Sequence, residues 1–122
     1  MRYQELTETE YEIRDTQTGL VWRRDPEPGE YTFDEALERA SQVAEETRQP
    51  WRVPTVGELL TLVDHSKKSP ASTFPDMPPY GFWSSSPYVG SANRAWVVGF
   101  GIGGVSYGYR GITLAVRLVR GG

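Results

Sequence analysis

The side chains best suited to chemistry in this sequence are its one histidine, His65, and the serine run Ser84, Ser85 and Ser86. A histidine that accepts the proton of a serine hydroxyl creates a nucleophile, so a hydrolase or transferase is the first hypothesis. The serines, however, do not stand in a Gly-x-Ser-x-Gly turn, and nothing in the sequence places an acid beside the imidazole. We therefore predict no catalytic residues and interpret His65 as a surface residue that follows a helix.

Metal chemistry has little support in the sequence either. Cysteine is absent, which excludes disulfides, thiolate chemistry and sulfur-ligated metals. With a single histidine, a zinc site is not expected. Calcium prefers several oxygen ligands, usually including carboxylates, yet residues 80–122 contain no Asp or Glu. The sequence thus predicts neither a metal site nor a cofactor.

The charges are unevenly distributed along the 122 residues. Residues 1–79 hold all 16 acids and nine of the 13 bases, whereas residues 80–122 hold the other four bases and ten of the 13 glycines. Four scattered arginines differ from the clustered basic face typical of nucleic-acid binding, so no nucleic-acid partner is expected. The length is typical of one domain, and we expect residues 1–122 to form a single one.

Targeting signals are not visible in the sequence. A run of about 18 apolar residues, as a membrane-spanning helix requires, does not occur, so no membrane span is expected. Residues 1–6 read Met-Arg-Tyr-Gln-Glu-Leu and lack the apolar segment of an export signal.

Two capping boxes mark the starts of helices. Thr32 and Glu35 are spaced so that each side chain accepts a hydrogen bond from the backbone N–H of the other residue. Apolar residues then recur at helical spacing, which predicts an amphipathic helix over residues 33–47. A second box, Thr55 with Glu58, predicts a shorter helix.

Alternating apolar and polar residues between turn residues predict short antiparallel strands. The expected segments are two strands within 11–24 around a turn at 15–19, a hairpin of 96–100 and 105–109 around Gly103-Gly104, and a last strand at 115–120. Polar, proline-rich residues 66–79 are expected to form a loop. The prediction is an α+β fold with two helices packed on small antiparallel sheets.

The same patterns separate core residues from displayed ones. Trp96 is in phase with Val98 and Phe100, which places it in the predicted core. Residues 51–55, Trp-Arg-Val-Pro-Thr, are interpreted as structural: the tryptophan is buried, the threonine caps a helix, and the arginine bonds backbone carbonyls or an acid.

Aromatic and apolar residues near the C-terminus leave two interpretations open. Tyr107 and Tyr109 share one face of a strand and could belong to the core or to a binding surface. Alternation of Tyr, Ser and Gly is typical of adaptable binding surfaces, because Tyr offers a large contact area with few rotatable bonds. If Ile102, Ile112 and Leu114 are exposed in loops, they form an apolar patch that marks a contact site.

Five segments resemble the bacterial Lcl C-terminal domain family, in the family's order and over residues 11–122. The matching segments are DTQTGLVW at 15–22, TFDEAL at 32–37, WRVPT with ELL at 51–60, FWSSS at 82–86 and AVRLVRGG at 115–122. The resemblance implies a C-type-lectin-like fold, related to the formylglycine-generating-enzyme-like branch. In such a fold a compact scaffold displays a ligand-binding surface from its C-terminal strands and loops.

Two departures from the family pattern carry implications. Exported members tend to have a cysteine pair at positions that match Ser41 and Leu118 here. Its absence agrees with a reducing compartment, so we expect a cytoplasmic or phage-associated protein. Formylglycine-generating enzymes work through cysteines, so the chain cannot perform that chemistry.

The C-terminal segment also resembles the variable proteins of diversity-generating retroelements, which rewrite the end of a gene by mutating template adenines, largely in asparagine codons. Residues that match fixed template positions are Phe100, Gly103, Val105, Arg110, Ala115, Val116 and Arg117. Residues that mutated AAC or AAT codons can encode are Gly101, Ile102, Gly104, Ser106, Tyr107, Gly108, Tyr109, Gly111, Ile112, Thr113 and Leu114.

The function predicted from the sequence is non-enzymatic ligand binding through a diversified surface within about residues 84–120. The alternative is an ordinary lectin-like adhesin domain that binds a glycan or polysaccharide. An interface of about 800 Å² per partner exceeds a sugar pocket, which favours a protein as the macromolecular ligand. The expected contact residues are Tyr88, Asn93, Gly101, Ile102, Ser106, Tyr107, Tyr109, Ile112, Thr113 and Leu114.

Overall fold

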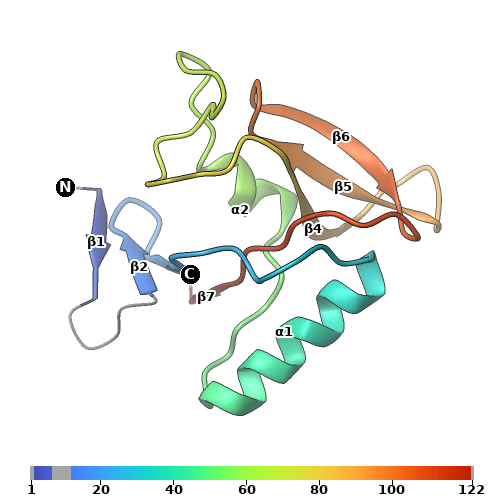
Figure 1. The fold of residues 1–122 in the computed structure, drawn as a ribbon, viewed down its shortest axis with the longest axis horizontal. Helices are drawn as coiled ribbons and strands as arrows, with labels where there is room; N and C mark the ends of the chain where they lie inside the picture. Colours follow the sequence, from blue (N-terminus) through green and yellow to red (C-terminus); the bar gives the residue numbers. More distant parts are fainter. Residues whose placement is uncertain (1, 7–11, 122) are drawn as a thin grey trace.

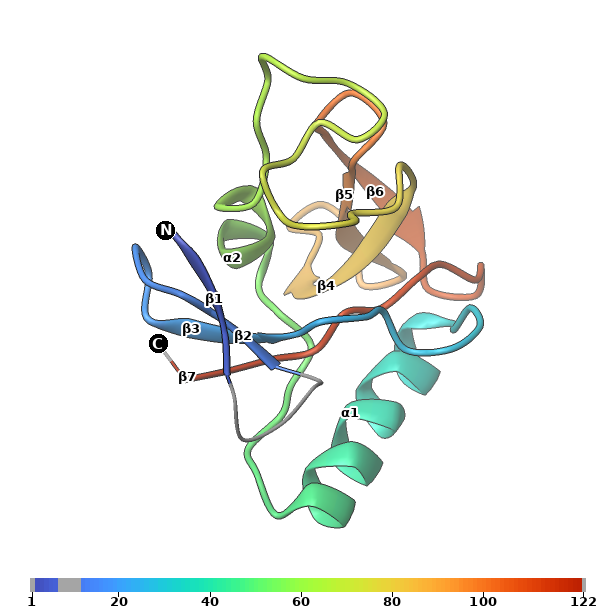
Figure 2. The ribbon, with the colours of Figure 1, turned by 60° about the vertical axis from the view of Figure 1, so that its left-hand side comes forward.

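A computed structural model describes residues 2–6 and 12–121, and it confirms an α+β chain with two antiparallel sheets and two helices (Figures 1 and 2). One sheet has the order β1-β2-β3-β7 and the other has the order β4-β5-β6. Neither of the helices described combines the length and the apolar character needed to cross a bilayer. The elements are β1 Tyr3–Glu5, β2 Glu12–Asp15, β3 Leu20–Arg23, α1 Phe33–Thr47, α2 Val56–Leu60, β4 Gly81–Pro87, β5 Arg94–Gly99, β6 Gly104–Tyr109 and β7 Val119–Gly121.

Both predicted capping boxes are confirmed. The Thr32 hydroxyl accepts the Glu35 N–H at the start of α1, and the Glu35 carboxylate accepts the Thr32 N–H. Thr55 and Glu58 do the same at the start of α2. These bonds satisfy backbone donors that the first helical turn leaves free.

Residues 51–55 have the structural role that their sequence indicated. Trp51 is buried, and Arg52 donates two hydrogen bonds to the Glu58 carboxylate, at 2.6 and 2.8 Å. Arg52 also donates to the Gly121 carbonyl at 3.0 Å. The arginine thus bonds both an acid and a carbonyl, and it joins α2 to the C-terminal strand.

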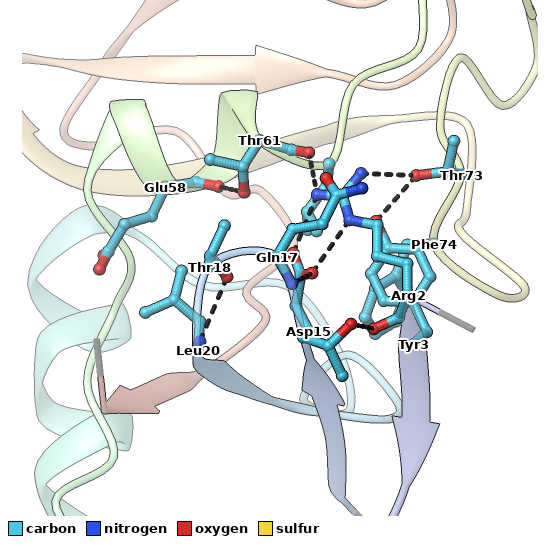
Figure 3. A network of polar contacts seen from close by, with 12 residues as sticks. Arg2, Tyr3, Asp15, Gln17, Thr18, Leu20, Glu58, Thr61, Thr73 and Phe74 are labelled. Atoms are coloured by element: carbon cyan, nitrogen blue, oxygen red, sulfur yellow. Dashed lines mark hydrogen bonds and ion pairs between the residues drawn. The ribbon is translucent and has the colours of Figure 1, made fainter.

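The predicted N-terminal hairpin is confirmed as β2 and β3, with Gly19 at φ +78° in its turn. Residue 11 of that prediction lies outside the described residues. Strand β1, which the sequence did not predict, pairs with β2. Next to it, Arg2 donates to both Asp15 carboxylate oxygens, at 3.0 and 2.9 Å, and to the Thr61 carbonyl at 2.7 Å (Figure 3). Arg2 thereby links β2 to Thr61 at the end of α2.

Asp15 remains charged although it is fully buried. Burial raises the pKa of its carboxyl, but hydrogen bonds from the Arg2 side chain and the Gln17 N–H outweigh that effect and lower the pKa below its usual value. A buried ion pair of this kind fixes geometry more than it adds stability.

The two faces of the β4-β5-β6 sheet are packed by different helices. On one face, Trp83 lies edge-on to Phe33 of α1, with ring centroids 5.7 Å apart, and donates its indole N–H to the Tyr31 carbonyl at 2.7 Å. On the other face, Phe82 and Val98 share a core cluster with Leu59 of α2. Side chains alternate along each strand, so neighbouring residues enter opposite clusters.

The predicted strand at 115–120 is shorter than expected. Strand β7 begins only at Val119, because the backbone bonds of residues 114–118 are divided among residues 27–31, the end of β3 and the edge of β4 instead of going to one partner strand. Arg117 in this segment is 1% exposed and donates to the carbonyls of Arg23 and Arg24. Burial lowers the pKa of its guanidinium to about 10, and the group remains protonated at neutral pH.

The predicted hairpin of β5 and β6 is confirmed, although its turn differs by one residue. Gly103 occupies the turn at φ +81°, and Gly104 already opens β6. Residues 66–79 form a loop as predicted; its Ser69 N–H and Ala71 N–H donate to the carbonyls of Gly101 and Phe100. The loop thus lies beside the turn (Figure 2).

Gly108 lies directly above the Trp83 indole, and this contact generates a stability prediction. A Cβ at position 108 would lie 3.0 Å from a Trp83 ring carbon, whereas at Gly104 the nearest heavy atom is 4.0 Å away. Because Trp83 is fully buried and held by Phe33 and Tyr31, it has little room to shift. Gly108→Ala should therefore lower the free energy of unfolding by about 1–3 kcal/mol.

Urea denaturation of Gly108→Ala, with Gly104→Ala as the matched control on the same strand, measures this effect. Equal free energies of unfolding for the two variants would contradict the proposed packing.

Candidate functional site

An exposed cluster of aromatic rings surrounds one arginine on the sheet face that α2 only partly covers. Its members come from the end of β4, from β5 and from β6, and we call them the aromatic face: Tyr88, Arg94, Trp96, Tyr107 and Tyr109. The strand register places Trp96 opposite Tyr107 and Arg94 opposite Tyr109. Directly opposite residues project from the same side of a sheet, so these side chains meet.

The guanidinium of Arg94 lies over two tyrosine rings. Its central carbon is 4.5 Å from the centroid of Tyr107 and 4.7 Å from that of Tyr109. Its Nη2 donates to the Tyr109 hydroxyl at 2.9 Å. Tyr88 completes the cluster, with its ring 4.8 Å from Trp96 and 4.9 Å from Tyr107. Cation–π and edge-to-face contacts hold the rings in place while their outer surfaces stay accessible.

The prediction that Trp96 belongs to the core is wrong. The side chain is only half-buried, and it packs against Tyr88 on the aromatic face. The fully buried Val98 is on the same side of β5, but at the end that α2 covers. Trp96, which belongs to neither buried core cluster, lies beside solvent.

The exposure of the two tyrosines answers the question that the sequence left open. Tyr107 is 44% exposed and Tyr109 is 53% exposed, so they belong to the surface. Val105, on the same side of β6, is 42% exposed. Such a group of exposed aromatic and apolar side chains is typical of a contact surface.

Arg94 differs electrostatically from the other three arginines of residues 80–122. Arg110 pairs with Asp34 at 2.7 Å, Arg120 pairs with Glu12 at 2.8 Å, and Arg117 is buried. Arg94 has no ion pair within residues 2–6 and 12–121, and its Nε is buried without a hydrogen-bond acceptor. The aromatic face therefore presents a positive charge that lacks a carboxylate.

The structure brings together only some of the predicted contact residues. Tyr88, Tyr107 and Tyr109 meet on the aromatic face. Asn93 is exposed just before β5, where its carbonyl accepts the Arg110 N–H at 2.8 Å. Ser106 is exposed on the opposite side of β6, because it alternates with its neighbours.

The single apolar patch expected from Ile102, Ile112 and Leu114 does not form. Ile102, with Gly101, precedes β6, whereas Ile112 and the exposed Thr113 follow it, so the two isoleucines lie at opposite ends of the strand. Leu114 is half-buried and packs against the core cluster of Trp83.

The side chains of His65, Ser84 and Ser86, which suggested a nucleophile and its base, form hydrogen bonds with other groups. His65 Nε2 lies 3.0 Å from the Gly103 carbonyl. The Ser84 hydroxyl donates to the Trp96 carbonyl at 2.7 Å, and the Ser86 hydroxyl accepts the Val56 N–H at 3.0 Å. In the described part of the chain, no three His, Cys, Asp or Glu side chains are grouped as a metal site would require.

Two hollows in the surface lie away from the aromatic face. One of about 580 Å³ is lined by residues 26–30, Tyr80 and Ala115. Another of about 510 Å³ lies between α1 and residues 51–58. None of their lining residues belongs to the aromatic face, whose rings lie along strands and suit a broad contact.

Comparison with known families matches this arrangement to a named domain. A model of the Lcl C-terminal domain matches residues 11–120. The chain belongs to the Lcl C-terminal domain family. No curated protein and no solved structure matched it. In this Lcl C-terminal domain, the motif tryptophans Trp22, Trp51 and Trp83 are all buried, so the family motifs build the scaffold.

The sequence analysis missed Arg94 and Trp96 as site residues. The parity of Trp96 along β5 is ambiguous, because it is shared with the charged Arg94 at one end of the strand and with the buried Val98 at the other. Arg94 itself could not be linked to Tyr107 and Tyr109 without the strand register.

Proposed function

We propose that this Lcl C-terminal domain is a non-enzymatic binding protein whose aromatic face contacts a macromolecular ligand, a protein. The observation that carries the proposal is a set of four aromatic rings, two exposed and two half-buried, around an arginine with no carboxylate partner in the described residues. Tyr, Trp and Arg are the residues most enriched at the energetic centres of protein interfaces. Their contacts with one another hold the rings in position, which lowers the entropy lost on binding.

We propose further that the scaffold is C-type-lectin-like and that the displayed residues are diversified by a retroelement. The burial of side chains supports a division between fixed scaffold positions and changeable displayed positions. Most residues that match fixed template positions are buried: Phe100, Gly103, Ala115, Val116 and Arg117. Most residues at the changeable positions are exposed: Ile102, Gly104, Ser106, Tyr107, Tyr109, Gly111, Ile112 and Thr113.

Two positions modify that division. Gly108 matches a changeable position but is buried against Trp83, and Val105 matches a fixed position but is exposed. We therefore expect position 108 to retain glycine when neighbouring positions vary.

The setting that we propose for the domain is the cytoplasm or a phage particle. Ser41 is exposed on α1 and Leu118 is buried, so neither position supplies the thiol that exported relatives tend to have. A protein without that cross-link depends on its packed core alone.

A glycan is the alternative ligand, and the exposed tyrosines are the feature that favours it. Their rings offer flat apolar surfaces for a sugar, and the Tyr107 hydroxyl is available for hydrogen bonds. A polysaccharide-binding adhesin domain would use the same face with a smaller contact area.

Binding screens with a displayed protein library and a glycan array test the function. We expect protein ligands whose affinity falls at least about tenfold in Trp96→Ala and in Tyr107→Ala, because hot-spot aromatics contribute about 2 kcal/mol or more. Leu37→Ala, which removes an exposed leucine on α1, is the control and should bind normally. Binding that these aromatic substitutions leave unchanged, or binding of glycans alone, would refute the proposal.

The DNA around the gene tests the retroelement. We expect a nearby reverse transcriptase and a near-copy of the codons for residues 84–120 that differs only at template adenines. A near-copy with mismatches at other bases, or no repeat at all, would leave an ordinary binding domain.

A further inference from the structure

Strand β6 is an edge of its sheet for which the described residues provide no outer partner, whereas the outer sides of β4 and β7 are both bonded. The outer side of β4 is bonded to the C-terminal segment, through Trp83 N–H to the Ala115 carbonyl at 3.0 Å and Ala115 N–H to the Gly81 carbonyl at 3.3 Å. The outer side of β7 pairs with Arg52 through bonds of 2.9 and 3.0 Å. Strand β6 ends its sheet and lies at the periphery of the molecule (Figure 1).

The hydrogen-bond pattern identifies the backbone groups that face outward. Arg110 N–H donates to the Asn93 carbonyl at 2.8 Å, and every second pair along an antiparallel ladder is bonded in this way. Gly108 and Ser106 therefore bond to β5, whereas the N–H groups of Val105 and Tyr107 point away from it. The bonds of Arg94, which lies opposite Tyr109, are consistent with this pattern. Its N–H donates to the Ser91 carbonyl and its carbonyl accepts the Tyr88 N–H, so neither group bonds to β6.

Strand β6 lacks the features that usually protect an edge. Its sequence, Gly-Val-Ser-Tyr-Gly-Tyr, has no charged residue and no proline. Natural proteins place charges, prolines or bulges on exposed edge strands to prevent pairing with another chain. An unprotected edge of six residues is a template for strand addition.

The aromatic face indicates what such a strand would carry. The side chains of Tyr107 and Tyr109 lie beside Arg94, whose guanidinium has no carboxylate partner in the described residues, and Val105 projects from the same side of β6 farther along the strand. Residues 80–122 contain no Asp or Glu that could supply one. An acidic side chain on the added strand would complement this charge through strong hydrogen bonds.

We propose that β6 pairs with an extended, acidic segment of a partner protein, which becomes the fourth strand of the β4-β5-β6 sheet and places an Asp or Glu against Arg94. The inference rests on the proposed function, since it assigns the ligand class of the same face. It also adds a feature that diversification cannot remove, because backbone hydrogen bonds persist when side chains change. A glycan has no regular series of N–H and carbonyl groups with which to make them.

The test begins with a displayed library of random 12-residue peptides. We expect selected peptides to combine β-branched or aromatic residues with at least one Asp or Glu. Arg94→Gln should weaken the selected peptide and reduce the salt dependence of its binding.

A matched pair of variants at Val105 isolates the backbone contribution. Val105→Pro removes an outward N–H that β5 does not use, and proline is tolerated at such edge positions. Val105→Ala removes the side chain but keeps the N–H. We expect about a tenfold loss of affinity for the proline variant, because it loses a backbone hydrogen bond to the added strand, and less than about threefold for the alanine variant, which keeps that bond.

Amide hydrogen exchange of the wild-type protein provides a readout that needs no variant. The Val105 and Tyr107 amides should exchange rapidly in the free protein and become protected with the selected peptide bound. The Ser106 and Gly108 amides should be protected in both states.

The outcomes separate this inference from the proposed function. Strand addition would be overturned if the two Val105 variants bound with equal affinity and the Val105 and Tyr107 amides stayed unprotected. In that case a loss of binding in Trp96→Ala would still support the aromatic face as the binding site. Binding unaffected by either Trp96→Ala or Arg94→Gln would refute both. Selection of peptides without acids, or no enrichment, would overturn the acidic partner. A dimer whose Val105 amide is protected without peptide would show that a second copy occupies the edge.

Discussion

The backbone of residues 114–119 hydrogen-bonds on both sides, and this double pairing joins the two sheets. On one side Leu114 exchanges two bonds with Tyr31, at 2.8 and 2.9 Å, and the carbonyls of Val116 and Leu118 accept from Glu27 and Arg23. On the other side the segment meets β4 and then Arg52. Val116 and Leu118 are fully buried, so the segment is also part of the core.

This segment determines which residues can be displayed. Phe100 and Ala115 are both buried, and the chain between them leaves the core as the β5–β6 turn, β6 and the following loop. Because both ends are fixed, the intervening side chains can change without loss of the anchoring contacts. Gly108 is an exception, since Trp83 lies under its backbone, and so is the buried turn residue Gly103, where a Cβ would lie 2.7 Å from a Val63 methyl carbon. Leu114 also packs against the core. A binding surface and a folding core can thus adjoin in a small domain.

Local signals in the sequence were sufficient for the helices and for the two hairpins. Thr32 and Thr55 determine helix starts through bonds to residues three positions away, and Gly19 marks a turn. Period-two alternation predicted the strands of the two hairpins but neither β1 nor β4. It also did not show which face of β5 is covered, because β5 is apolar on both faces and α2 covers only part of one. Trp96 was therefore assigned to the core. Arg94 carries no local signal that links it to Tyr107 and Tyr109, since these partners are on another strand, 13 and 15 residues away.

The central claim is that stability and display are assigned to different residues of one C-terminal segment, and a saturation mutagenesis scan of positions 100–119 scored by folded yield tests it most directly. We expect broad tolerance at the exposed positions, with free-energy changes within about 0.5 kcal/mol. Truncation of Phe100 should cost about 3–5 kcal/mol, and any side chain at position 108 should lower the folded yield, with alanine tolerated best. Equal sensitivity at Tyr107, Tyr109 and Phe100 would contradict the account, because the aromatic face would then be part of the folding core.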